Sequence, residues 1–414
     1  MKKFFDCIRV PEEKSLLSFF EDTFNLRTVN DLISFKENEA PDNYLPFYMR
    51  GYYLPINDSF GGEINKICQH ARQKLGFKKN EIEFYVANDA EFNSSSILST
   101  SKNRPHIVII NRGLLDRVNI DELAFVMGHE IGHLIYQHSY ASRVIQFVYP
   151  EYENMPPFLQ KLYDVWSKLG EISADRIGLL VCQKIETAVR ALFKLSSGLD
   201  DRSFQVSFDN LVKISEDTFY EMAQNPSYVS ASHPANPIRI KALTEFYNSK
   251  MGKSIMKGKI CAADAPLEEK INEILMLIRK IPFNEEEELS LALLASAGMK
   301  IMLSEPRPSD EEYDYLLNVL SDFIHWPPAY LDQLNPDNLE EVLKTSSKTL
   351  VEKYPQRVRD LLRNLFPIIV RDKKLKNGEV TTFMSIATDD LKIPVSEVVE
   401  LFLDGLRELF KPGY

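Results

Sequence analysis

The residue types that could carry out chemistry lie together at His129-Glu130-Ile131-Gly132-His133. On an α-helix, residues four apart lie one turn above the other, so the imidazoles of His129 and His133 leave from one face. Two imidazoles on one face can bind a single metal ion, and Glu130 lies beside them, where its carboxylate can activate a bound water. The spacing therefore predicts a metal site that has its own general base.

The segment 119–138 has the features of the helix that must position these side chains. Asn119 can accept a hydrogen bond from the amide of Glu122, and Glu122 can reach back, which is the pattern of a capping box. Apolar residues then recur at helical spacing without an intervening proline. They are Ile120, Leu123, Ala124, Val126 and Met127.

Two histidines leave the metal site incomplete, because a catalytic zinc usually has three protein ligands and an open position. A third histidine ten residues after His129 is absent, since that residue is Ser139. His138 is one position off and, on a continuing helix, would point well away from His133. We interpret His138 as a helix-end residue that interacts with the helix dipole.

A second predicted helix, from about Phe158 to Cys182, offers the missing ligand. Glu171 and Asp175 are four residues apart and share one face of this helix. One carboxylate can bind the metal while the other accepts a hydrogen bond from the outer N–H of a ligand imidazole. The prolines in 144–158 interrupt the first helix and let the second return antiparallel to it.

Three motifs follow one another along the chain: His129-Glu130-x-Gly132-His133, then Glu171-x-x-Ala174-Asp175-Arg176, then Ser232-His233-Pro234 with Arg239-Ile240. In this order they resemble the HtpX-like and CAAX-prenyl-protease family of zinc peptidases, which belongs to the gluzincins. The resemblance covers roughly residues 62–247. It implies Zn²⁺, one per chain, bound by His129, His133 and Glu171, with Glu130 as the general base.

The same resemblance implies roles for residues around the metal. Asp175 would orient a ligand imidazole, and His233 would stabilise the oxyanion of the tetrahedral intermediate. Arg239 would buttress the loop that carries His233. A strand over Ser94–Thr100 would pair its free edge with the backbone of an extended substrate. The substrate-binding residues on this strand would be Ser95, Ser96, Ile97 and Leu98.

The predicted fold class is α+β, mainly α, with three parts. Residues 1–61 form a helical and extended segment, extended over Asn38–Gly62, that packs on the catalytic domain. Residues 62–250 form a zincin-like domain with a small sheet and the active-site helix. After a linker over 248–265, residues 266–414 read as helices only, and they loosely resemble TerB-like domains through two similar helix–acidic turn–helix arms.

Composition narrows the functional classes further. A net charge of −11 argues against a nucleic-acid partner. No apolar run is long enough to span a bilayer, and the N-terminus lacks the apolar core of a signal peptide, so we expect a cytoplasmic protein without an integral membrane segment. The four cysteines form no Cys-x-x-Cys pair, which predicts free thiols rather than a zinc knuckle.

The leading hypothesis is a soluble zinc metalloendopeptidase that acts on peptides or unfolded proteins, with a possible protein partner for its helical C-terminal domain. The alternative is a catalytically silent protein of the same fold that acts as a chaperone or interaction module. A third hypothesis is a latent peptidase whose cleft is covered by the segment Tyr44–Pro55 or by the loop 144–158.

Overall fold

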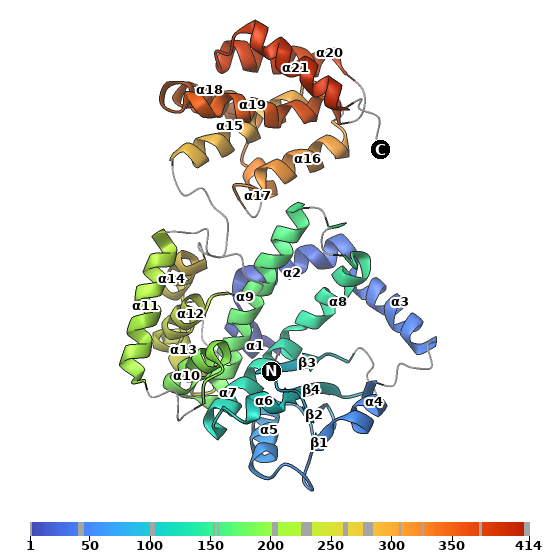
Figure 1. The fold of residues 1–414 in the computed structure, drawn as a ribbon, viewed down its shortest axis with the longest axis vertical. Coiled ribbons are helices and arrows are strands. Elements are labelled where there is room, and N and C mark those ends of the chain that lie inside the picture. Colours follow the sequence, from blue (N-terminus) through green and yellow to red (C-terminus); the bar gives the residue numbers. More distant parts are fainter. Residues whose placement is uncertain are drawn as a thin grey trace. The chain divides into compact units, whose positions relative to one another are not determined.

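A computed structural model describes the protein over residues 2–39, 45–99, 104–151, 154–155, 157–200, 206–224, 234–259, 264–275, 285–305, 308–324, 327–371 and 375–409. The chain divides into two compact units. The first comprises residues 1–154 and 163–278, and the second comprises residues 155–162 and 279–414 (Figure 1). The motif residues of the proposed metal site that the structure describes lie in the first unit.

A four-stranded mixed sheet lies in the first unit, with the strand order β1-β2-β4-β3. The two central strands are parallel, and each edge strand is antiparallel to its neighbour. Ile107, Val108 and Ile110 of β4 are buried, as expected for a central strand rich in β-branched residues. The strands are β1 (Leu54–Ile56), β2 (Ile82–Ala87), β3 (Ser94–Ile97) and β4 (His106–Asn111).

Helix α7 (Ile120–Tyr136) packs against α5 (Gly62–Lys74) and against strands β3 and β4. It follows the short α6 (Arg112–Leu115), which leads out of β4. Most of its residues are buried, so the helix lies between the sheet and the other helices of the unit. This central position brings β3 to the side of α7 that carries Glu130.

Small residues let α7 approach α9 (Pro157–Cys182) closely. A Cβ atom on Gly128 would come within 2.7 Å of the Val181 side chain and 2.9 Å of the Gly178 Cα. A Cβ atom on Gly132 would come within 3.1 Å of the Ala174 Cα. Because the backbones nearly touch at these positions, the motif of α7 faces the motif of α9.

The N-terminal helices α1 (Lys2–Ile8) and α2 (Pro11–Phe24) dock on α7 and α9 through buried hydrogen bonds. The Tyr136 hydroxyl donates to the Phe5 carbonyl over 3.1 Å. Arg176 Nη1 donates to the Ile8 carbonyl over 2.8 Å, and the Val10 amide donates to Ser173 Oγ over 3.1 Å. These contacts fix the start of α2 beside the middle of α9.

The other helices of the first unit surround this centre. Asp264, just before α14, accepts a hydrogen bond from the Met251 amide in α13, and α14 packs on α12. The helices are α3 (Leu26–Glu39), α4 (Leu45–Tyr52), α8 (His138–Val148), α10 (Ile185–Ser197), α11 (Phe208–Gln224), α12 (Asn236–Asn248), α13 (Lys250–Ile255) and α14 (Ala265–Leu275).

The second unit contains helices around its own apolar core, which is centred on α15 and α18. Ser309 and Glu312 form a capping box at the start of α16, as their spacing predicts. The described helices that follow α14 are α15 (Glu285–Met302), α16 (Asp310–Leu320), α17 (Pro327–Leu331), α18 (Pro336–Lys353), α19 (Pro355–Leu365), η3 (Phe366–Val370), α20 (Asn377–Ser385), η4 (Ile386–Asp390) and α21 (Val395–Leu409).

The predicted fold class, α+β and mainly α, is confirmed. Two local predictions are wrong. The segment 38–62 is not simply extended, because α4 forms within it and buries Met49 against Tyr85 and Ile107. The segment 248–265 is not a simple linker, since α13 buries Met251 and Ile255.

The predicted domain boundary at residue 266 also differs from the structure, which groups α14 with the first unit. The TerB-like resemblance stays a prediction.

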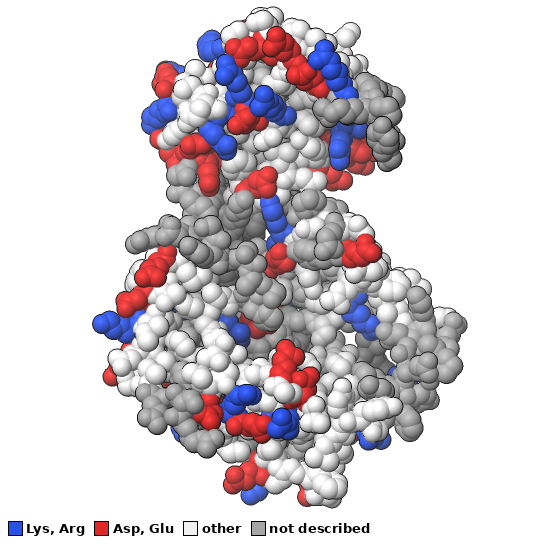
Figure 2. Space-filling model, in the orientation of Figure 1, with Lys and Arg blue, Asp and Glu red and all other residues white. Residues whose placement is uncertain are grey.

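None of the described helices is long and apolar enough to cross a membrane. On the face drawn in Figure 2, lysines and arginines are interspersed with aspartates and glutamates.

Candidate metal centre

The start of α7 is fixed by the predicted capping box. Asn119 Oδ1 accepts from the Glu122 amide over 3.0 Å, and Glu122 Oε2 accepts from the Asn119 amide over 2.9 Å. Lys194 Nζ donates to the same Glu122 oxygen over 2.8 Å, and both side chains are buried. The helix that carries the two motif histidines is therefore anchored at its first turn to α10.

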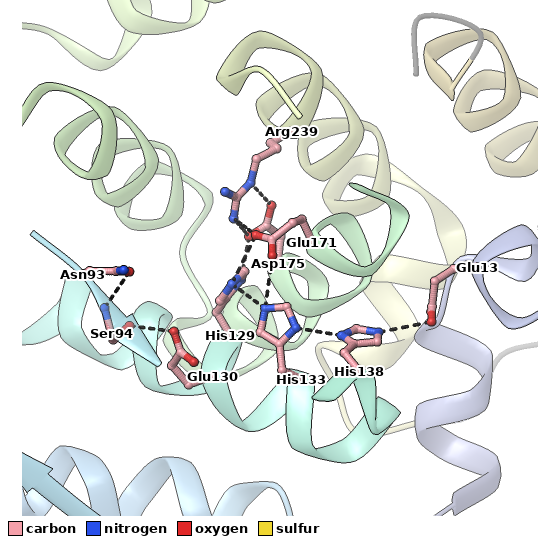
Figure 3. A network of polar contacts seen from close by, with 10 residues as sticks. All are labelled: Glu13, Asn93, Ser94, His129, Glu130, His133, His138, Glu171, Asp175 and Arg239. Atoms are coloured by element: carbon pink, nitrogen blue, oxygen red, sulfur yellow. Dashed lines mark hydrogen bonds and ion pairs between the residues drawn. The ribbon is translucent and has the colours of Figure 1, made fainter. Parts of the chain in front are cut away.

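Three potential ligands converge where α7 faces α9. The Nε2 atoms of His129 and His133 are 3.0 Å apart. Glu171 Oε2 lies 3.5 Å from Nε2 of His129, and Oε1 lies 3.4 Å from Nε2 of His133. One atom from each residue lies within 4.8 Å of the others, so the three side chains form a cluster that can hold one metal ion (Figure 3).

The outer nitrogen of His129 contacts a carboxylate. Nδ1 of His129 lies 2.9 Å from Oδ1 of Asp175, which is buried. Arg239 donates to the same carboxylate through Nε over 2.8 Å and through Nη2 over 2.7 Å. Burial alone would raise the pKa of Asp175, but the attraction of the Arg239 guanidinium and its hydrogen bonds lower it. Asp175 is therefore an anion that can accept the N–H of His129.

The outer nitrogen of His133 contacts a second histidine. Nδ1 of His133 lies 2.7 Å from Nδ1 of His138, and Nε2 of His138 lies 3.1 Å from Oε1 of Glu13. Glu13 is completely buried, and its carboxylate also accepts from Ser173 Oγ over 3.1 Å. Figure 3 shows the line of side chains from Glu13 to His133.

The interpretation of His138 as a helix-end residue that points away from His133 is wrong. Gln137 adopts a left-handed conformation with φ of 59°, which ends α7 and starts α8. The bend turns the ring of His138 back toward His133, and the side chain is buried. No spacing rule signals this arrangement, because a regular helix through position 138 would place the ring elsewhere.

Glu130 faces the sheet side of the site. Its Oε1 accepts a hydrogen bond from Ser94 Oγ over 2.6 Å, and Ser94 is the first residue of β3. Burial raises the pKa of Glu130, whereas His129 and the serine hydroxyls of Ser94 and Ser96 act in the opposite direction. A carboxylate whose pKa lies above its usual value is suited to accept a proton and pass it on near neutral pH.

A cleft of about 500 Å³ opens onto the three potential ligands and Glu130. One side is formed by β3, including Ser94, Ser95 and Ser96, and another by Trp166 and Ser167 of α9. Pro234 and Arg239 also line the cleft. The cleft therefore runs past the edge strand β3 and past the cluster of His129, His133 and Glu171.

The remaining predicted site residues fall in different places. His233 lies outside the described residues. Arg239 contacts Asp175 and lies 3.4 Å from Glu171, which ties it to the carboxylates of α9. Its predicted contact with the loop that carries His233 falls outside the described residues and stays a prediction. Ile97 packs with Met49, Tyr85 and Ile107 on one face of the sheet, and Leu98 follows the end of β3. The backbone of β3 is at the edge of the sheet.

The donor set fits Zn²⁺. Zinc sites commonly combine imidazole nitrogens with a carboxylate oxygen, and three protein ligands leave a position for water. Burial lowers the pKa of His133 well below its usual value, which favours a neutral ring with a free lone pair. The outer nitrogens of both histidines also have partners, as is usual for imidazoles that bind a metal.

One helix carries two histidines and a glutamate, and a second helix supplies a carboxylate that faces them beside an edge strand. This is the site architecture of a metallopeptidase. Residues 61–152 and 154–247 match the model of Peptidase family M48. The chain therefore contains a peptidase family M48 domain. This agrees with the family resemblance of the three motifs.

The chain is also similar to the plastoglobule-localized metallopeptidase 48, chloroplastic, of Arabidopsis thaliana. The two are 26% identical over 174 residues, which cover 39% of this chain and 50% of that protein. The chain thus spans about half the length of this relative. No solved structure matches the chain significantly.

Proposed function

We propose that the protein is a zinc-dependent endopeptidase that hydrolyses peptide bonds in extended or unfolded polypeptides. The observation that carries this proposal is the convergence of His129, His133 and Glu171, with Glu130 on the same helix. When bound there, Zn²⁺ would polarise the scissile carbonyl and lower the pKa of a water molecule. The family M48 match of residues 61–152 and 154–247 supports the same class of reaction.

Glu130 acts in this proposal as the general base and then as the general acid. It takes a proton from the attacking water and returns that proton to the leaving amine. Its raised pKa supports both roles, because a weakly acidic carboxylate holds the proton long enough to pass it on. His233 stabilises the oxyanion of the tetrahedral intermediate as a donor from outside the ligand set.

Asp175 and Arg239 act in this proposal by positioning the metal ligands. Asp175 accepts the N–H of His129 and so keeps Nε2 of that ring free to bind the metal. Arg239 stabilises the buried Asp175 anion by a bidentate ion pair at 2.7 and 2.8 Å. An Asp175 carboxylate that stays ionised also makes His129 a better ligand.

The substrate backbone pairs with the free edge of β3. An edge strand presents unpaired N–H and C=O groups, and an extended peptide can add to it as a further strand. Ser95, Ser96, Ile97 and Leu98 would supply this backbone surface, while Ser94 contacts Glu130. Binding through the backbone suits a peptidase of broad sequence preference.

Substitution of the base tests the mechanism. Glu130→Gln retains the shape of the side chain and all three ligands but cannot accept the proton, so cleavage of an unfolded protein or a peptide library should fall by at least about 100-fold. Zinc content, measured by metal analysis, should stay at one per chain. Unchanged cleavage by this variant would contradict the proposed role of Glu130.

Measurements on the unaltered chain separate the alternatives. One bound zinc without cleavage of any peptide would favour the catalytically silent interaction module. Activity that appears only after cleavage within the loop 144–158 would indicate latency. The cytoplasmic location and a protein partner for the second unit remain proposals that rest on the sequence.

A further inference from the structure

The N-terminal helix α2 contributes a buried carboxylate to the surroundings of the metal site. We propose that Glu13 and His138 are positioning residues, which fix the protonated nitrogen of His133 through a relay from Glu13 to His138 to His133. This inference rests on the proposed metal site. It adds to that site one residue, Glu13, that precedes the family M48 match, which begins at residue 61.

The direction of each hydrogen bond in the relay follows from which groups can donate and which can accept. A carboxylate only accepts, so Nε2 of His138, 3.1 Å from Oε1 of Glu13, carries the hydrogen. A ring that carries a single hydrogen has an acceptor at its other nitrogen, which is then Nδ1 of His138. Across 2.7 Å, the partner nitrogen Nδ1 of His133 must be the donor. His133 therefore keeps its lone pair on Nε2, which faces Glu171 at 3.4 Å.

The opposite arrangement is incompatible with metal binding. If Nδ1 of His138 carried the hydrogen, Nδ1 of His133 would have to accept it. Nε2 of His133 would then be protonated and could not bind a metal. The Glu13 carboxylate thus selects the ligating form of His133 across an intervening ring. Asp175 does the same for His129 by direct contact.

The side chains of Glu13 and His138 are both held rigidly. Glu13 is completely buried, forms a bidentate ion pair with Arg9 and accepts from Ser173 Oγ. The ring of His138 packs edge-on against Trp166, with centroids 5.7 Å apart. Gly170 makes room for that ring, because a Cβ atom there would lie 3.1 Å from the imidazole. A rigid relay allows one geometry at His133.

The protonation pattern can be read directly in the unaltered, zinc-loaded chain. The protein contains seven histidines, so ¹⁵N-histidine labelling gives a tractable spectrum. We expect His138 to carry its hydrogen on Nε2 and His133 on Nδ1, with assignments from single substitutions. A hydrogen on Nδ1 of His138, or on both of its nitrogens, would overturn the proposal, and this measurement needs no variant of Glu13.

Glu13→Gln tests the relay by metal affinity. The amide has nearly the same shape, but it can donate as well as accept, so His138 is no longer restricted to one form. We expect the zinc dissociation constant, measured by competition with a chromophoric chelator, to rise by about tenfold or more. The ¹⁵N signals of His138 should change from one form to a mixture.

Tyr136→Phe is the matched control. It removes a buried hydrogen bond, 3.1 Å long, that docks the same N-terminal segment through the Phe5 carbonyl, and it leaves the relay intact. Its melting temperature should fall while its zinc affinity stays within about twofold of the unaltered chain. Equal losses of affinity in Tyr136→Phe and Glu13→Gln would assign Glu13 a structural role only and overturn the proposal.

The outcomes distinguish this inference from the proposed function. If the unaltered chain binds no zinc, the proposed function fails and the relay fails with it. If the chain binds zinc and cleaves peptides but Glu13→Gln has the same affinity and the same His138 form, only the relay is overturned. Should Glu13→Gln fail to fold, the spectrum of the unaltered chain still decides.

Discussion

Gly132 of α7 lies directly against Ala174 of α9, where a Cβ atom on the glycine would come within 3.1 Å of the alanine Cα. This close approach sets the distance between the imidazoles of α7 and the carboxylate of Glu171, which is one turn before Ala174 on α9. The small residues thus shape the proposed metal site, although none of them offers a ligand.

Gly128→Ala is expected to disturb the site through the backbone. The added Cβ would meet Val181 at 2.7 Å and the Gly178 Cα at 2.9 Å, so α9 must move. We expect a loss of about 1–3 kcal/mol in the free energy of unfolding together with weaker zinc binding. Chemical denaturation and chelator competition measure the two effects. Gly51→Ala, where a Cβ atom meets nothing within 4 Å, is the control and should weaken neither, since alanine favours the helix α4 in which Gly51 lies.

Asp175→Asn should weaken both zinc binding and the fold. The amide leaves the buried Arg239 without its bidentate anionic partner, with Glu171 at 3.4 Å as its remaining carboxylate contact, and breaking a buried ion pair costs about 3–5 kcal/mol. The loss of the carboxylate beside His129 should weaken zinc affinity by roughly 10–100-fold. Asp121→Asn is a fair comparison, since it removes an ion pair with Lys184 that is exposed to solvent and should therefore change stability little. Equal effects of the two substitutions would contradict the role given to Asp175.

Removal of the metal should lower the melting temperature, because an ion bound at the proposed site would join α7 to α9. Ligand binding stabilises the folded chain by about 4 kcal/mol when the free zinc concentration is a thousand times the dissociation constant. Dialysis against a chelator should therefore destabilise the protein, and one equivalent of Zn²⁺ should restore it. His133→Ala lacks one ligand and should show a much smaller shift. A melting temperature that does not respond to zinc would contradict a metal site at these residues.

The sequence predicts those parts of the site that depend only on the spacing of residues along one helix. The four-residue intervals from His129 to His133 and from Glu171 to Asp175 each put two groups on one helix face, and the capping box at Asn119 marks where α7 begins. The prolines of 144–158 separate α8 from α9 as predicted. These features depend only on helix geometry, so they need no knowledge of the tertiary structure.

The contacts of His138 and Glu13 could not be predicted in this way. Gln137 takes a left-handed backbone conformation that glycine or asparagine usually signals, and glutamine gives no such indication. Glu13 looks like an ordinary acidic residue in the first turn of α2. Its buried position depends on the docking of α2 against Ser173 and Arg9, which is a tertiary property.

Ser94→Ala should shift the pH dependence of hydrolysis. The Ser94 hydroxyl donates to Glu130 and stabilises its ionised form, so its loss should raise the pKa of Glu130 further. A general base works only when ionised, and the acidic limb of the kcat/KM profile should therefore move to higher pH. Activity at pH values above that limb should change little. Ser95→Ala, an exposed neighbour on β3, is the matched control and should leave the acidic limb of the kcat/KM profile in place. A shift of that limb to lower pH in Ser94→Ala would contradict the role given to the Ser94 hydroxyl.

Backbone methylation of the substrate tests the edge of β3. If an extended peptide pairs with this strand, alternate amides of the peptide donate to it, whereas the amides between them point away. A series of peptides, each N-methylated at one position, should therefore show an alternating pattern in KM. Methylation at every second position near the cleaved bond should raise KM by about tenfold, because each methyl removes a donor and adds bulk. A change in kcat alone, or a uniform effect of methylation at all positions, would show that side-chain pockets rather than the β3 backbone hold the substrate. Since β3 also supplies the hydroxyl that contacts Glu130, a substrate aligned on its backbone would be aligned on the base as well.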